Sequence, residues 1–193
     1  MSVAVIILAA GKSERLGSPK QLLAYNGKTL LQHSIDEAKN MGSDHVVVVL
    51  GANEPVILQQ INDPGIIVLD NNKWKEGMAS SIRCGISHLL DTEYESVIIM
   101  VCDQPYVNSA LLKSIYQKYL ETGNPIVASE YAGRPGTPAL FHRSLFADLL
   151  LLKGDVGAKQ IIQRKKQSVS LVGFPEGITD IDTREDYEAL ESK

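Results

Sequence analysis

The most suggestive stretch for chemistry near the N-terminus reads VIILAAGKSERLGSPKQLL. An apolar run ends in the small residues Ala9, Ala10 and Gly11, and cations follow at Arg15 and Lys20. Small residues let backbone N–H groups approach a phosphate closely, and nearby cations neutralise its charge. The stretch therefore indicates a phosphate-binding loop, with a solvated surface loop as the alternative.

This loop is not a nucleotide-binding P-loop, although it contains the tripeptide Gly11-Lys12-Ser13. A P-loop requires a second glycine five positions before the glycine of that tripeptide, and Ile6 stands there. The dinucleotide-binding fingerprint is also excluded, because five residues separate Gly11 from Gly17. Phosphate binding would therefore depend on the small-residue turn and its cations, among which Lys12 is the least secure.

Two aspartates far downstream stand at positions where a functional acid could lie. Asp103 follows the apolar run 97–102, so we expect it at the carboxyl end of a central strand, where ligands of a parallel sheet bind. The alternative is an ordinary turn aspartate before Pro105. Asp182 directly precedes Thr183, a predicted helix cap, where an acid also complements the helix dipole.

Short apolar runs rich in Val and Ile recur along the chain and predict strands that are covered on both faces. They lie at residues 3–9, 46–50, 66–69, 97–102, 126–129, 139–141 and 169–172. The segment 131–141 is rich in Gly and Pro before it becomes strand-like, and it predicts an added antiparallel strand.

Helical patterns separate most of these runs. They cover residues 30–41, 56–61, 79–90, 108–121, 144–151 and 156–164, with a further helix start at Thr183. The alternation predicts an α/β fold with a mostly parallel sheet. Ligands of such sheets bind at the carboxyl ends of the strands, where Gly11 and Asp103 are expected.

Length and composition restrict the remaining possibilities. The chain has 193 residues without a linker-like stretch, which predicts a single domain over residues 1–193. The net charge is −4 and like charges do not cluster, so we expect no nucleic-acid partner. The apolar run 3–10 is too short to span a membrane and lacks the basic start of a signal peptide. Cys84 and Cys102 lack metal-ligand spacing, which predicts buried thiols in a cytoplasmic protein.

The opening motif LAAGKSERLGSPK, residues 8–20, resembles the signature L-A-[AG]-G-x-S-x-R-[MF]-G-x-x-K of the molybdenum cofactor nucleotidyltransferase family. The resemblance extends along nearly the whole chain. Four further stretches resemble later motifs of that family: NKWKEGMASS from residue 72, CDQP from 102, LKGDVGAK from 152 and DIDTRED from 180. Each motif alone is moderately specific for this family, and all of the motifs in this order are strongly specific for it.

The resemblance implies a three-layer, Rossmann-like α/β fold of the glycosyltransferase-A type. It also implies nucleotidyl transfer, in which an acceptor attacks the α-phosphate of a nucleoside triphosphate and pyrophosphate leaves. Asp103 and Asp182 correspond to ligands of Mg²⁺ in that family. Lys20 corresponds to the contact with the α-phosphate, and Arg15 to a contact with the β- and γ-phosphates. Lys20, Arg15 and Asp103 are thus the predicted catalytic residues.

The same resemblance assigns the substrate contacts. Nucleotide binding is predicted for Leu8, Ala9, Ala10, Gly11, Arg15, Lys20, Gly77 and Ser81. Contacts with the acceptor are predicted for Trp74, Gly133 and Pro135. Trp74 could stack on a pterin or a base, with a core or lid position as the alternative. The stretch GRPGTP from residue 133 departs from the shorter G-x-P pattern of the family.

Together these features favour an enzyme that transfers CMP from CTP to molybdopterin. Ala10 favours CTP, because guanylyl-transferring relatives often carry Gly at this position. A molybdoenzyme or its insertion chaperone would be the partner. One alternative is an enzyme of the same fold that uses GTP or acts on a sugar or polyol phosphate. Another is a non-catalytic carrier of the cofactor, which would not need Arg15, Lys20, Asp103 and Asp182 together.

Overall fold

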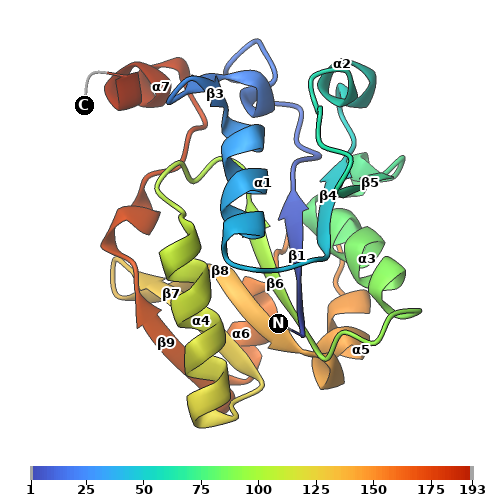
Figure 1. The fold of residues 1–193 in the computed structure, drawn as a ribbon, viewed down its shortest axis with the longest axis vertical. Coiled ribbons are helices and arrows are strands. Elements are labelled where there is room, and N and C mark those ends of the chain that lie inside the picture. The colour runs from blue at the N-terminus through green and yellow to red at the C-terminus, as the bar shows by residue number, and fades with distance from the viewer. Residues whose placement is uncertain (1, 192–193) are drawn as a thin grey trace.

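The computed structural model describes residues 2–191 and is built on a seven-stranded sheet (Figure 1). The strand order in the sheet is β5-β4-β1-β6-β8-β7-β9. The bounds are β1 (Val3–Leu8), β4 (Val46–Leu50), β5 (Ile67–Asp70), β6 (Ser96–Val101), β7 (Ile126–Tyr131), β8 (Arg134–His142) and β9 (Val169–Gly173). All seven sequence-predicted strands are therefore present.

Strand β8 runs antiparallel to both of its neighbours, β6 and β7. The pairs β1–β4, β1–β6, β4–β5 and β7–β9 are all parallel. The mostly parallel sheet and the added antiparallel strand are both confirmed. Because β1 and β6 are parallel neighbours, the loops that follow them leave the sheet side by side at the same edge.

Helices cover both faces of the sheet, which gives three layers (Figure 1). Helices α1 (Leu30–Asn40), α2 (Glu54–Leu58) and α4 (Ser109–Thr122) pack on one face. Helices α3 (Met78–Leu89), α5 (Phe146–Leu150) and α6 (Lys159–Arg164) pack on the other. Helix α7 (Arg184–Glu191) lies beside the short hairpin β2 (Ala24–Tyr25) and β3 (Lys28–Thr29). Single 3₁₀ turns are η1 (Lys20–Leu22), η2 (Trp74–Glu76), η3 (Arg143–Leu145), η4 (Lys166–Ser168) and η5 (Pro175–Ile178).

Strand β1 shows why consecutive apolar residues are needed here. All six of its residues are buried, and alternate side chains point to opposite faces of the sheet. Val5 and Ile7 join the core under α1 and α4, whereas Ala4 and Ile6 join the core under α3. A buried central strand of this kind holds the loop that follows it in a fixed position.

The structure differs from the sequence expectations in some local details. The hairpin β2–β3 was not predicted, although Asn26 and Gly27 have the positive φ angles of 49° and 79° that suit an Asn-Gly turn. Helix α6 begins at Lys159 rather than at residue 156. Cys102 is buried as predicted, but Cys84 is only partly buried, because it lies at the margin of its core.

The start of α7 confirms the predicted cap. Asp186 Oδ2 accepts hydrogen bonds from Thr183 N at 2.8 Å and from Asp182 N at 3.2 Å. Thr183 Oγ1 in turn accepts from Asp186 N at 3.2 Å. This reciprocal cap fixes the backbone of Asp182 just before the helix. Among residues 2–191, every helix is too short or too polar to cross a membrane.

A histidine pair at the amino end of β4 predicts a pH-dependent stability. His45 Nε2 lies 3.2 Å from His88 Nε2, and Tyr94 and Asp44 lie beside them. Burial and the facing His88 lower the pKa of His45, so the imidazole of His45 binds a proton more readily in the unfolded chain than in the folded protein. The neutral imidazole therefore contributes fully to the stability of the folded protein above the ordinary histidine pKa of about 6.5. This contribution declines as the pH falls through that value.

We therefore expect the melting temperature to be lower at about pH 5.5 than at about pH 7.5. Thermal denaturation of the protein and of a His45→Gln variant measures this effect. The variant should show a flatter dependence over the same range, and an identical slope in the two proteins would refute the assignment to His45.

Candidate active site

The loop after β1 turns its carbonyl groups towards the protein. Gln21 Nε2 donates hydrogen bonds to the carbonyl oxygens of Ala9 at 2.7 Å and Gly11 at 3.1 Å. The N–H group of Ala52 donates to the carbonyl oxygen of Ala10 at 3.1 Å. Within the described chain, the N–H groups of Ala10 and Gly11 have no protein acceptor. These groups are therefore available to an anionic ligand, as the small-residue turn predicts.

Lys20 lies between the two aspartates that the sequence singled out. Its Nζ atom donates to Asp103 Oδ2 in a short ion pair and to Asp182 Oδ1 at 2.8 Å. The lysine side chain is only 14% exposed. Arg15 Nη2 donates to the other oxygen of Asp182 at 2.8 Å, and its side chain is largely exposed. Two cations of the loop and two downstream carboxylates thus form one network.

Backbone structure positions three members of this network. Asp103 lies two residues beyond the end of β6, so it leaves the sheet beside the loop that follows β1. The N–H group of Ile181 donates to the carbonyl oxygen of Asp103 at 2.9 Å, which holds the chain before α7 against the end of β6. The N–H group of Lys20 donates to Ser13 Oγ at 3.0 Å. Lys20 and Asp182, which are 162 positions apart in the sequence, therefore meet because backbone contacts fix the segments that carry them.

The charges in the network stabilise one another. Burial lowers the pKa of Lys20, but the charge of Asp103 and the hydrogen bonds to both carboxylates outweigh burial and raise it. The hydrogen bond from Lys20 is the main reason that the pKa of Asp182 is lowered. Lys20 and Asp182 are therefore both charged at neutral pH, as phosphate and metal binding require.

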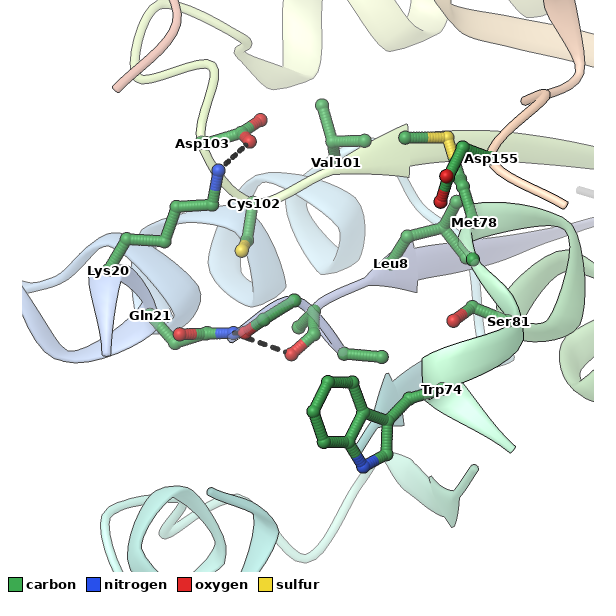
Figure 2. A pocket seen from close by; sticks show the side chains of 14 residues that line it. Leu8, Lys20, Gln21, Trp74, Met78, Ser81, Val101, Cys102, Asp103 and Asp155 are labelled. Atoms are coloured by element: carbon green, nitrogen blue, oxygen red, sulfur yellow. Dashed lines mark hydrogen bonds and ion pairs between the residues drawn. The ribbon is translucent and has the colours of Figure 1, made fainter. Parts of the chain in front are cut away.

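A cavity of about 260 Å³ lies beside this network (Figure 2). Lys20 and Asp103 lie at one side of it, and the indole of Trp74 lies at another. Nine predicted site residues line it: Leu8, Ala9, Ala10, Gly11, Lys20, Trp74, Gly77, Ser81 and Asp103. Arg15 and Asp182 adjoin it through their ion pairs with each other and with Lys20.

Close packing holds Trp74 and Ala10 next to each other. A Cβ atom on Gly51 would lie 2.6 Å from Trp74 Cβ and 3.0 Å from Ala10 Cβ. Gly51 therefore allows the tryptophan to approach the loop. Gly77, at the start of α3, has a φ of 92°, and a Cβ atom there would lie 2.5 Å from the backbone of Gly154. Both glycines are thus required by the shape of the cavity wall.

Ser81 is buried on α3 and faces the same cavity (Figure 2). Its Oγ atom accepts a hydrogen bond from Asn71 Nδ2 at 3.0 Å. Because the hydroxyl already accepts from Asn71, it can donate its own hydrogen to an acceptor in the cavity. This arrangement suits a contact with a carbonyl or ring nitrogen of a base.

Some candidate residues lie elsewhere. Lys12 pairs with Glu14 at 3.0 Å and is exposed outside the cavity. Gly133 and Pro135 line a separate groove beside α6, and their contact with an acceptor stays a prediction. The structure thus brings together the predicted nucleotide and metal residues but not these two acceptor residues.

Five residues of the cavity wall were not predicted from the sequence: Gln21, Met78, Val101, Cys102 and Asp155. Gln21 follows Lys20 directly, and this position beside a predicted phosphate-binding cation is the sequence feature that could have identified it. Burial raises the pKa of the Cys102 thiol to about 12, so this thiol is a packing group rather than a nucleophile. Asp155 reaches the wall through the contact of its loop with Gly77, which the sequence does not reveal.

Gln21 is fully buried, and its Oε1 atom is the one buried side-chain acceptor without a partner among the described residues. We expect Gln21→Leu to lower the free energy of unfolding by about 1–3 kcal/mol, because two loop carbonyls lose their donor. Chemical denaturation measures this, with the exposed Gln117→Leu as the control. Equal stability of the two variants would contradict this role of Gln21.

The donor set at the network fits a divalent cation. Carboxylate oxygens of Asp103 and Asp182 lie around one ammonium group, and such hard donors suit Mg²⁺ or Mn²⁺. The part of the chain that the structure describes contains no cluster of three or more His, Cys, Asp or Glu arranged for a metal. Two carboxylates leave coordination positions for phosphate oxygens and water, which Mg²⁺ commonly retains.

The mostly parallel sheet covered on both faces, with its cavity at the strand ends, is a Rossmann-like α/β fold, and the matching family model places it in the nucleotidyltransferase class of enzymes. The family model described as the MobA-like NTP transferase domain matches residues 5–169. The chain therefore belongs to the MobA-like NTP transferase domain family.

Three relatives show the range of similarity. The nicotine blue oxidoreductase of Paenarthrobacter nicotinovorans is 29% identical, over 93% of this chain and 92% of its own. A probable molybdenum cofactor guanylyltransferase of Bacillus cytotoxicus is 32% identical, over 59% of this chain and 55% of its own. The crystal structure of Rv0371c from Mycobacterium tuberculosis H37Rv in complex with manganese is 26% identical, has a TM-score of 0.81 and covers both chains fully. That complex suggests a divalent metal for this fold.

Proposed function

We propose that this protein transfers CMP from CTP to molybdopterin and releases pyrophosphate. The observation that carries the proposal is the position of Lys20 between Asp103 and Asp182 beside a cavity whose wall offers unpaired N–H groups. Phosphoryl transfer asks the protein mainly to position two anions and to stabilise charge in the transition state. Cations, carboxylates and N–H groups in one place are suited to that task.

The network suggests how the nucleotide would be held. Lys20 and Arg15 would exchange a carboxylate partner for phosphate oxygens, and the N–H groups of Ala10 and Gly11 would bind further oxygens. Asp103 and Asp182 would hold Mg²⁺, which when bound stabilises negative charge on the reacting phosphates. Lys20 would place its ammonium group at the α-phosphate, where phosphate oxygens would replace the carboxylates as its anionic partners.

One feature favours CTP over GTP. The methyl group of Ala10 and the Cβ atom of Trp74 both lie close to Gly51 at the cavity wall, and a methyl group at this point leaves less room for a purine than the hydrogen atom of a glycine would. Ser81 would donate to the base, so that a base without an acceptor at that point would leave the hydroxyl unpaired. GTP remains the alternative that the guanylyltransferase relative suggests.

Molybdopterin is proposed as the acceptor on the strength of the family resemblance and of that same relative. The face of Trp74 could stack on the flat pterin ring or on the base. The product would pass to a molybdoenzyme or its insertion chaperone. Gly133 and Pro135 line a separate groove and carry no part of the proposed nucleotide contacts.

Pyrophosphate release with each of the four nucleoside triphosphates and Mg²⁺, with and without molybdopterin, tests the proposal. Release that requires both CTP and molybdopterin is the expected result. Release with GTP would identify GTP as the nucleotide substrate in place of CTP. Release with a sugar or polyol phosphate would identify that compound as the acceptor in place of molybdopterin. A non-catalytic carrier would bind CTP and Mg²⁺, seen as a raised melting temperature, without forming pyrophosphate.

A further inference from the structure

Strand β9 forms one edge of the seven-stranded sheet and pairs with β7 alone. The N–H group of Phe174 donates to the carbonyl oxygen of Glu130 in β7 at 2.8 Å. Because backbone groups alternate along a strand, the N–H groups of Leu171 and Gly173 point away from β7. In the described chain this edge is therefore open to a further strand, and Leu171, at the middle of β9, is 41% exposed.

Two grooves flank this edge and share Leu171. One, of about 600 Å³, lies between α6 and the β7–β8 hairpin. The other, of about 700 Å³, lies along α4 on the opposite face of the sheet. Five cations line the two grooves: Arg134, Lys159 and Lys166 in the first, and Lys113 and Lys118 in the second.

The charged side chains that line the two grooves are almost all positive. Glu121 is the one acidic residue that lines either groove, whereas the whole chain carries a net charge of −4. Among residues 2–191, the nine recorded ion pairs include none of the five cations. A second copy that paired β9 with β9 would place these cations against their equivalents, and like-charge repulsion opposes this.

We propose that the β9 edge binds an extended acidic segment of another polypeptide, which adds to the sheet next to β9. Backbone hydrogen bonds to the outward groups of Leu171 and Gly173 would supply affinity, as in other cases of strand addition. Apolar side chains of the segment would pack on Leu171. Its carboxylates, on both faces of the new strand, would meet the unpaired cations of the two grooves.

Fluorescence anisotropy with a labelled peptide of about ten residues that repeats the pattern Glu-Glu-Val-Val, which places Glu and Val on both faces of an extended strand, tests this proposal on the whole chain. We expect saturable binding that weakens as salt is added, and no binding of the same peptide with Lys in place of Glu. The double variant Lys113→Glu/Lys166→Glu should weaken binding at least roughly tenfold. Lys153→Glu, at an exposed lysine that lines neither groove, should not change it.

Leu171→Pro, compared with Leu171→Ala, tests the backbone contacts separately from the leucine side chain, because proline also removes an outward N–H group and is tolerated on edge strands. The proline variant should lose the peptide binding that the alanine variant keeps in part, and it should keep its melting transition and pyrophosphate release, since the edge lies outside the catalytic cavity. Equal binding of the acidic and basic peptides would overturn the proposal. So would the absence of peptide binding together with dimers of the double variant, because the cations would then serve only to prevent self-association.

Discussion

Asp103→Asn is expected to lower the rate of pyrophosphate release by roughly 10³-fold or more. Asparagine keeps the size of the side chain but removes the negative charge that would bind a divalent cation. It also leaves Lys20 with Asp182 as its one carboxylate partner in the network. The rate is measured under saturating nucleotide and metal, so that weak binding does not hide the effect on the transition state.

Asp63→Asn is the matched control for this substitution. Asp63 also accepts a hydrogen bond from a lysine, Lys39, at 2.7 Å, but lies outside the cavity. Its variant should keep the rate of the unmodified protein. Full activity of Asp103→Asn would contradict the metal-binding role of Asp103, and equal losses in both variants would show that the effect is not specific to the site.

Lys20→Met is expected to lower kcat by roughly 10²–10³-fold, because the positive charge at the α-phosphate is lost while the length of the side chain is nearly kept. The folded protein should also change. Asp103 and Asp182 would face each other without the cation between them, and their repulsion should lower the melting temperature at neutral pH. The two measurements together separate a loss of catalysis from a loss of folding.

Lys12→Met removes a lysine from the same loop and provides the control. Lys12 is exposed and pairs with Glu14, so its loss should change kcat by less than about twofold and the melting temperature little. If Lys20→Met retained the kcat of the unmodified protein, Lys20 would have no role in the transition state. A large effect of Lys12→Met would mean that the ligand reaches further along the loop than the cavity suggests.

The sheet could be predicted because its strands are buried on both faces, which requires consecutive apolar residues such as those of β1 and β4. Local turns were harder to predict from the sequence than the strands. The Asn26-Gly27 hairpin carries a recognisable signal, but its strands are two residues long and lack an apolar pattern. The first residues of the predicted helix 156–164 are instead a turn that packs Gly157 against Met78.

The position of Asp103 was predictable because the apolar run before it marks a central strand, and Lys20 was expected at the same edge of the sheet from its place in the loop after β1. The pairing of Asp182 with Lys20 depends on the backbone bond from Ile181 to Asp103, which a sequence pattern does not reveal. Gln21 was missed because its role depends on the direction of two loop carbonyls. The positions of Gly133 and Pro135 depend on how far the β7–β8 hairpin extends, which is likewise a property of the fold.

The most direct test of the central claim is pyrophosphate release measured together with the fluorescence of Trp74, the single tryptophan of the chain. Trp74 lines the cavity, so its emission should change when CTP and Mg²⁺ bind. The account predicts this change together with pyrophosphate release that needs molybdopterin and disappears in Asp103→Asn. A fluorescence change without pyrophosphate release, for every nucleoside triphosphate and with molybdopterin present, would contradict nucleotidyl transfer at this site.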